Sequence, residues 1–329
     1  MGDELDHVLT TARAWLDAGH KVALATVIET WGSAPRRKGS HAIIRDDGLF
    51  EGSVSGGCVE GDVIVSAQDL LRQGGGSVRR DYGIADDMAW QVGLACGGEI
   101  SVFVQTIDDE HFPPAMFDTI AAARAAGQSI GVTTDLATGY SAEQLSSDQT
   151  FTNIYPPRLR MMIVGAVHIA QSLAPLAALV GYQPLLVDPR DGFAAASRFA
   201  DITVDTRWPD EAIAEWRPDS ATAVVTLSHD PKIDDPALVL ALRSPAFYIA
   251  ALGSRRTHAR RIERLTALGF SESELARIQG PAGLAIGAVN PAEIALSIMA
   301  GATAALRLGT AQSDAGKILT RQGEVSAGG

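Results

Sequence analysis

Two cysteines, each beside a pair of glycines, are the residues of this chain best suited to chemistry. Cys58 follows a diglycine, Cys96 precedes one, and the 329 residues hold no other cysteine. A cysteine placed for packing needs apolar neighbours, whereas glycine is kept where the backbone takes a positive φ or where a ligand comes close. The pair therefore favours a soft-ligand or reactive-thiol site over the ordinary alternative, two small buried hydrophobic side chains.

Thiolates suit thiophilic metal centres and persulfide exchange. Cys58 lies just before a predicted helix over 59–71, whose positive end favours an anion, so we expect it to be the more reactive thiol. Zinc is disfavoured because neither C-x-x-C nor H-E-x-x-H spacing occurs. Glu60 and Glu99 lie near the cysteines in the sequence and could form an acid/base pair, although surface acids at strand ends are commoner.

Arginines recur where a turn leads into the next element. Arg36 follows Gly-Ser-Ala-Pro, and Arg255 and Arg256 follow Leu-Gly-Ser. Guanidinium groups beside helix N-termini form good sites for phosphate or a polar heterocycle, so we expect these three to contact a ligand. The arginines inside the following predicted helix are expected to be solvated surface charges: Arg260, Arg261 and Arg264.

The second half begins with the pattern of a dinucleotide fingerprint. A predicted strand over 161–164 leads into Gly165, and Asp188 ends the next predicted strand. Val167 occupies the middle glycine position of G-x-G-x-x-A, where a β-branched side chain obstructs the approach of a pyrophosphate. Asp188 could hold a ribose hydroxyl or simply begin a loop. The pattern thus predicts a Rossmann-like fold and disfavours ordinary NAD binding.

Ser-His-Asp over 228–230 ends a further predicted strand, at the sheet edge where α/β sites form. A hydrolase triad is not supported because no G-x-S-x-G elbow supplies a nucleophile. We therefore expect His229 to cap a loop or position a ligand, and we assign no catalytic residue.

The strands and helices that the sequence predicts around these residues indicate an α/β protein with two domains. We expect an N-terminal α/β domain over 1–140, a linker over 141–158, a Rossmann-like domain with a doubly wound parallel sheet over 159–309, and a disordered tail over 310–329. The boundary rests on a polar, irregular stretch that ends in a diproline.

Composition narrows the class of protein and its compartment. The net charge of −12 argues against nucleic acid and anionic membranes as partners. Two cysteines cannot form a disulfide framework, and the acidic start of the chain is unlike a secretory signal, so a cytoplasmic location is expected. The uncharged stretch 161–187 is long enough to span a bilayer, but its glycines and prolines divide it into strand, helix and strand.

Seven segments together resemble a known family. In the first half they are Gly-Ser-Ala-Pro-Arg over 32–36, Gly-Ser-Val-Ser-Gly-Gly-Cys-Val-Glu over 52–60 and Gly-Leu-Ala-Cys-Gly-Gly over 93–98. In the second half they are Val-Asp-Pro-Arg over 187–190, Ser-His-Asp over 228–230, Leu-Gly-Ser-Arg-Arg over 252–256 and Gly-Pro-Ala-Gly-Leu over 280–284. The chain is similar, over about residues 26–299, to the XdhC/CoxI family of xanthine dehydrogenase accessory factors. It departs from the family pattern at Val167, Ala250 and Gly301.

The resemblance implies a chaperone of molybdenum cofactor, with a cofactor-handling N-terminal domain and a Rossmann-like C-terminal one. Such a protein binds the molybdopterin-type cofactor, assists its sulfuration with a cysteine desulfurase, and hands it to a molybdenum hydroxylase apoenzyme such as xanthine dehydrogenase. Cys58 and Cys96 would contact the metal or its sulfur, and the arginines would hold phosphate or pterin. The residues expected to bind cofactor are Ser33, Arg36, Gly56, Gly57, Cys58, Cys96, Gly97, Gly98, Asp188, His229, Arg255 and Arg256.

We therefore expect a cytoplasmic, homodimeric carrier of molybdenum cofactor rather than a turnover enzyme. The alternative is an NAD(P)-dependent oxidoreductase that uses the Rossmann-like domain. A third possibility is a scaffold that links desulfurase to target, in which the cysteines only pack.

Overall fold

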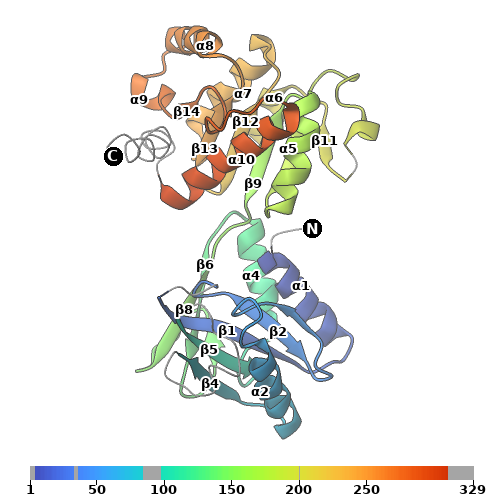
Figure 1. Ribbon diagram of the computed structural model, residues 1–329, viewed down its shortest axis with the longest axis vertical. Coiled ribbons are helices and arrows are strands. Elements are labelled where there is room, and N and C mark those ends of the chain that lie inside the picture. Colours follow the sequence, from blue (N-terminus) through green and yellow to red (C-terminus); the bar gives the residue numbers. More distant parts are fainter. Residues whose placement is uncertain (1–3, 33–35, 84–97, 200, 310–329) are drawn as a thin grey trace, which may run out of the picture. The chain divides into compact units, whose positions relative to one another are not determined.

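The computed structural model describes residues 4–32, 36–83, 98–199 and 201–309. The chain forms two compact units that meet in the sequence between Pro157 and Arg158, each with its own sheets and core (Figure 1). The expected tail over 310–329 lies outside the described residues.

The N-terminal unit is built on an antiparallel sheet with strand order β3-β2-β1-β5-β4. Its strands are β1 (Val22–Trp31), β2 (His41–Arg45), β3 (Phe50–Gly52), β4 (Ser77–Tyr82) and β5 (Glu99–Thr106). Side chains alternate along each strand, so the sheet buries both faces. On β1, Ala23 and Ala25 face the core under α2 (Glu60–Gln73), whereas Val22 and Leu24 face the core under α1 (Glu4–Asp17) and α4 (Ala115–Ala125).

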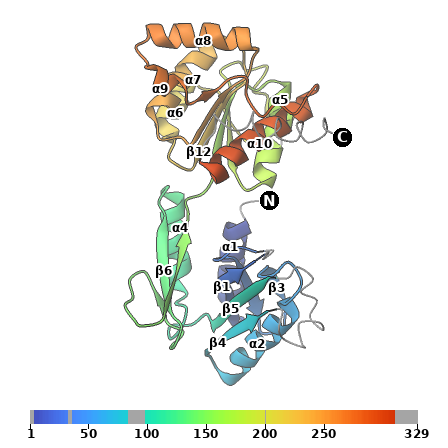
Figure 2. The ribbon, with the colours of Figure 1, turned by 60° about the vertical axis from the view of Figure 1, so that its left-hand side comes forward.

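A second, three-stranded sheet of order β7-β6-β8 completes this unit. Its strands are β6 (Ile130–Asp135), β7 (Ser141–Ala142) and β8 (Thr150–Tyr155), and Figure 2 shows β6 running beside α4. The expected linker over 141–158 is therefore wrong for most of its length. The alternation Thr-Phe-Thr-Asn-Ile-Tyr of β8 pairs with β6 from Ile130↔Tyr155 to Asp135↔Thr150, so the polar stretch before it is a connection inside the unit.

The C-terminal unit holds a six-stranded sheet of order β11-β10-β9-β12-β13-β14, and all its pairings are parallel. Its strands are β9 (Arg160–Val164), β10 (Gln183–Val187), β11 (Thr203–Asp205), β12 (Thr222–Thr226), β13 (Tyr248–Ala251) and β14 (Ile278–Gln279). The chain starts in the middle of the sheet, moves outward to β11, and returns to the other side of β9. This confirms the predicted doubly wound, Rossmann-like sheet.

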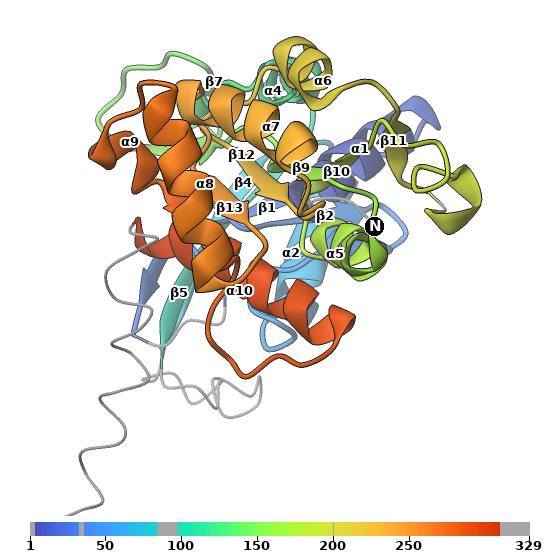
Figure 3. The same ribbon diagram turned by 90° about the horizontal axis from the view of Figure 1, so that it is seen from above.

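Helices cover both faces of the parallel sheet (Figure 3). One core contains side chains of α5 (His168–Leu179) and α10 (Pro291–Leu308), and the other contains side chains of α6 (Pro209–Trp216), α7 (Pro231–Arg243) and α8 (Arg255–Ala267). The short η1 (Ala196–Arg198) follows β10, and α9 (Glu272–Leu275) follows α8. On β9, Met161 and Ile163 enter the first core while Met162 and Val164 enter the second. Burial on both faces explains the continuous apolar sequence of this strand.

The uncharged stretch 161–187 forms β9, α5 and β10 within this sheet. Within the described residues, α10 alone is long and apolar enough to cross a membrane by length and composition. Five of its apolar side chains are buried in the core that α10 shares with α5: Ala295, Ile298, Met299, Ala302 and Ala305.

Candidate functional site

Cys58 lies in the loop that joins β3 to α2 in the N-terminal unit. Its thiol is free and half-buried, and its side chain packs against the same core cluster as Tyr82 of β4. Gly56 and Gly57 both have positive φ, 77° and 112°, so the loop uses the conformational freedom that glycine provides before a cysteine. The diglycine thus shapes the turn that presents the thiol.

Glu60, the first residue of α2, holds this loop together. Its Oε1 accepts from Ser53 Oγ at 2.7 Å and from the backbone N–H of Ser55 at 2.9 Å, and its Oε2 accepts from the N–H of Gly57 at 2.8 Å. The N–H of Gly56 also donates to Oε1, at 3.1 Å, and Ser55 Oγ–H donates to Oε2. The carboxylate therefore replaces water as the acceptor for most polar hydrogens of the loop.

These contacts keep Glu60 ionised. Burial acts to raise its pKa, but the hydrogen bonds from Ser55, Ser53 and the backbone outweigh burial and lower the pKa to about 2. The hydroxyl of Ser55 completes the loop by accepting from the N–H of Cys58 at 2.9 Å and of Val59 at 2.8 Å. The backbone donors thus bind groups of the protein itself, and the loop offers a ligand the Cys58 thiol.

Arg36 lies against this loop. Its Nε donates to the carbonyl oxygen of Ser53 at 3.1 Å, and its guanidinium also pairs with Glu4 of α1. The structure therefore brings Arg36 together with the loop of Gly56, Gly57 and Cys58, although the two segments are far apart in the sequence. Ser33 lies outside the described residues.

Cys96 and Gly97 also lie outside the described residues, but the chain on both sides of 84–97 is described. Tyr82 ends β4, and its hydroxyl donates to Asp62 in the first turn of α2 at 2.6 Å. Gly98 is buried, and Glu99 begins β5 opposite Trp31. Both flanks of the Cys96 segment therefore end at the end of the sheet that adjoins the start of α2.

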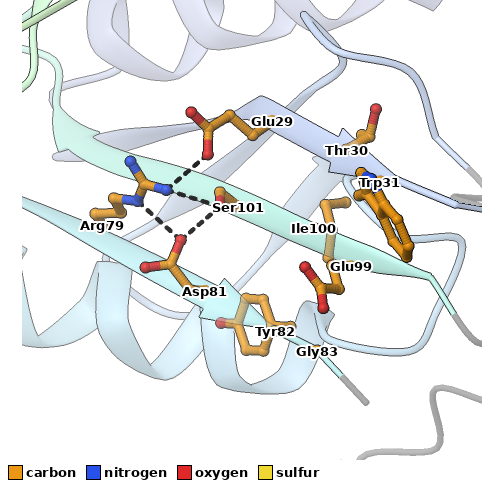
Figure 4. Close-up of a pocket in the computed structure, with 10 residues that line it drawn as sticks. All are labelled: Glu29, Thr30, Trp31, Arg79, Asp81, Tyr82, Gly83, Glu99, Ile100 and Ser101. Carbon is orange, nitrogen blue, oxygen red and sulfur yellow. Dashed lines mark hydrogen bonds and ion pairs between the residues drawn. The ribbon is translucent and has the colours of Figure 1, made fainter. Parts of the chain in front are cut away.

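A pocket of about 670 Å³ opens at this end of the sheet (Figure 4). At one side Arg79 binds Glu29 at 2.7 Å and Asp81 at 2.8 Å, and it also donates to Ser101 at 3.1 Å. The opposite side holds Trp31, Tyr82 and Glu99. The pocket thus combines aromatic rings with carboxylates, only some of which are neutralised by the arginine.

In the C-terminal unit, Asp188 is fully buried and its carboxylate is engaged by the protein. One oxygen accepts from the N–H of Ala166 at 2.7 Å, and Arg190 binds both oxygens, at 2.8 and 2.7 Å. Burial raises the pKa of Asp188, but the hydrogen bonds from Arg190 and Ala166 outweigh it and lower the pKa. Asp188 therefore links the turn after β9 to the end of β10.

His229 is exposed and has a positive φ of 63°. Its neighbour Ser228 donates to Asp234 at 2.7 Å, and burial of Asp234 raises the pKa of that carboxyl, opposed in part by Ser228 and Arg261. Asp234 is a polar residue at this sheet edge that the sequence analysis missed. It lies four residues after a Pro-flanked N-cap, Asp230, and no local pattern marks it as buried.

Arg255 and Arg256 are exposed in the first turn of α8. The expectation that Arg261 is a solvated surface charge is wrong. Arg261 is 2% exposed; it donates to the carbonyl of Leu252 at 2.9 Å and lies 3.8 Å from Asp234. Its burial lowers its pKa. The helical spacing could have predicted this burial, because Arg261 lies one turn before Leu265 on the same face of α8, and Leu265 is fully buried.

The expected binding residues thus fall into two groups. Arg36, Cys58 and the described glycines belong to the N-terminal unit, and Asp188, His229, Arg255 and Arg256 belong to the C-terminal unit. In the described part of the chain, no group of three or more His, Cys, Asp or Glu side chains is arranged to hold a metal ion.

Comparison with known proteins relates both units to one family. Residues 15–83 match the XdhC and CoxI family, and residues 161–301 match the XdhC Rossmann domain. The chain is 30% identical to the molybdenum cofactor insertion chaperone PaoD of Escherichia coli (strain K12), covering 90% of this chain and 87% of PaoD. It is 27% identical to a protein of Bacillus subtilis (strain 168) named as a probable xanthine dehydrogenase subunit, covering 88% of this chain and 95% of that protein.

A solved structure described as a xanthine dehydrogenase from Bacillus halodurans superimposes with a TM-score of 0.78 at 26% identity. The match covers 95% of this chain and 98% of that chain. The similarity therefore extends over the whole architecture, including both units.

Proposed function

This chain belongs to the XdhC and CoxI family, and from this premise we propose that it binds molybdenum cofactor and delivers it to a molybdenum hydroxylase of the xanthine dehydrogenase type. The cofactor is its cargo, and the protein acts as a carrier rather than as a turnover enzyme. Assistance to sulfuration, together with a cysteine desulfurase, belongs to the same proposal, as do a cytoplasmic location and a homodimeric state.

The observation that carries the proposal is the presentation of Cys58. The thiol is free and half-buried, and the loop that bears it is held by Glu60 and Ser55 rather than by the ligand. A preorganised loop loses little conformational entropy when its cargo binds. A thiolate is a soft ligand that suits a thiophilic metal centre or its sulfur. Cys58 can therefore hold the metal end of the cofactor reversibly.

Cys96 would supply a second thiol in this proposal. Before its segment, Tyr82 ends β4 and binds Asp62 in the first turn of α2, and Cys58 lies two residues before that helix. Beyond the segment, Glu99 begins β5. Two thiols on one cargo would bind it more tightly than either alone and would allow its release in two steps.

The proposal is tested by purifying the protein from cells that make the cofactor and assaying molybdenum and pterin. We expect the wild type to carry both, and Cys58→Ser to carry at least tenfold less molybdenum while unfolding at the same temperature. If the wild type carries neither above background, even with the target enzyme co-expressed, the carrier function is wrong. If Cys58→Ser and Cys96→Ser together leave activation of the target enzyme intact, the cysteines only pack and the protein is a scaffold.

A further inference from the structure

We propose that the pocket at the joint end of β1, β4 and β5 binds the pterin ring of the cargo, with Trp31 as its stacking surface and Glu99 as the acceptor for its donor edge. This inference rests on the proposed carrier function and assigns a subsite to it. The pocket is distinct from the Cys58 loop: Ile100 packs in the core under α2 with Cys58 and Tyr82, so Glu99 and its partner Trp31 project from the other face of the sheet. Tyr82, whose hydroxyl binds Asp62 of α2, lies at the edge of the pocket.

Trp31 has the geometry of a stacking surface. Its side chain is 70% exposed although tryptophan is the largest apolar side chain, and it stands at the end of β1, where the backbone is held by β5. Aromatic rings bind flat heterocycles by offset stacking, which adds to the gain from removing both surfaces from water. An exposed indole on a rigid strand therefore predicts a planar ligand.

Glu99 faces the same ligand as Trp31. The two residues are directly opposite each other on neighbouring antiparallel strands, so their side chains project to the same face of the sheet, and Figure 4 shows both at the pocket. Among the described residues no hydrogen bond or ion pair engages the Glu99 carboxylate, whereas Glu29 and Asp81 are both bound by Arg79. Glu99 is thus the carboxylate in this pocket that remains available to a ligand.

A free carboxylate beside an indole suits a flat heterocycle that carries hydrogen-bond donors on one edge. A pterin presents two adjacent N–H donors, on its 2-amino group and on N3, and a carboxylate accepts both in a bidentate pair. The carboxylates of Glu29, Asp81 and Glu99 outnumber Arg79, so the pocket repels phosphate and other anionic groups. The neutral ring therefore enters the pocket, and the anionic metal-binding and phosphate ends of the cargo point away from it.

The size of the pocket agrees with this assignment. A volume of about 670 Å³ falls in the range of small-molecule sites and exceeds what a bicyclic ring requires. The remaining volume leaves room for the part of the cofactor next to the ring.

The test uses the full chain and two soluble probes, pterin (2-amino-4-oxopteridine) and lumazine (2,4-dioxopteridine), in calorimetric titrations. We expect pterin to bind and lumazine, which lacks the 2-amino donor, to bind at least tenfold more weakly. Trp31→Ala and Glu99→Gln should each weaken pterin binding at least tenfold. Matched controls at positions outside the pocket, Trp208→Ala and Glu51→Gln, should change it less than twofold.

The pocket assignment is overturned if pterin does not bind, or if Trp31→Ala and Glu99→Gln bind it like the wild type. The same variants, purified from cofactor-producing cells, separate this result from the carrier function. If the wild type carries molybdenum and both variants retain as much, the pocket is wrong and the carrier stands. If the wild type carries no molybdenum but binds pterin through Trp31 and Glu99, the pocket stands and the carrier function fails.

Discussion

At the scale of single residues, Glu60 matters as much to the site as the cysteine two positions before it. Its buried carboxylate accepts hydrogen bonds from the N–H groups of Ser55 and of both glycines, so the shape of the loop depends on the charged acid. Glycines at positive φ would otherwise leave this segment free to take many conformations. Glu60 therefore holds the loop that presents Cys58.

Replacing Glu60 with glutamine tests this role. The amide keeps one acceptor oxygen but turns an NH₂ toward the donors of Ser55 and Gly57, so we expect a loss of about 3 kcal/mol in the free energy of unfolding. The control is Asp69→Asn, an acid-to-amide change on the same helix, where the exposed side chain pairs with Arg72 and with no other described residue. It should cost less than about 0.5 kcal/mol. Equal effects in chemical denaturation would contradict the role of Glu60.

The low pKa of Glu60 predicts a pH dependence with a definite sign. The folded-state pKa of about 2 lies below the ordinary value of 4.5, so the stabilisation is complete above about pH 4.5 and is lost as the pH falls toward 2. Glu60→Gln lacks this titration. The difference in unfolding free energy between wild type and variant should therefore be constant from pH 7 to pH 5 and shrink below it; a difference that grows in acid would refute the assignment.

At the scale of elements, the turn between β9 and α5 packs closely against the end of the neighbouring strand β12. Gly165 has a φ of +106°, and a Cβ there would lie 2.7 Å from the backbone nitrogen of Ser228 on the neighbouring strand's end. Val167, by contrast, is the N-cap of α5 with an extended backbone at φ −79° and packs against the core. The first glycine of the fingerprint is thus required by the fold, whereas the second position accepts a β-branched residue.

Gly165→Ala should therefore cost more than the strain of a positive φ alone. Gly269, with a φ of +92° and no atom within 4 Å of a built Cβ, is the matched control in the same unit. We expect Gly269→Ala to lose about 1–2 kcal/mol from backbone strain and Gly165→Ala to lose a further 1–3 kcal/mol, roughly, from the contact with Ser228. Thermal or urea unfolding measures both; equal losses would show that the close approach is unimportant.

At the scale of the whole molecule, the chain is two units with separate cores. The N-terminal unit carries the thiol loop and the pocket, and the C-terminal unit carries the Rossmann-like sheet. We expect calorimetry to resolve two unfolding transitions. For units of this size, Glu60→Gln should lower only one of them, by about 6–12 °C, and Gly165→Ala only the other, by about 4–20 °C. Both variants shifting a single shared transition would show that the units unfold together.

Much of the architecture follows from local sequence patterns. Continuous apolar runs at 161–164 and 185–187 predict buried parallel strands, because such strands are covered on both faces, and the structure confirms them as β9 and β10. The unusual placement of Cys58 between a diglycine and a helix singles out the loop. The same segments also indicate the family. These features can be predicted from the sequence because each depends on residues that are neighbours along the chain.

Other features depend on which distant segments pair, and only the tertiary structure decides them. The register of β1 with β5 places Trp31 opposite Glu99, and the pairing of β6 with β8 turns an expected linker into a strand. Arg261 is buried because α8 packs against the end of β13 and α7. No local pattern reports a cross-strand partner, since a strand's alternation fixes which side chains share a face but not what lies beside them.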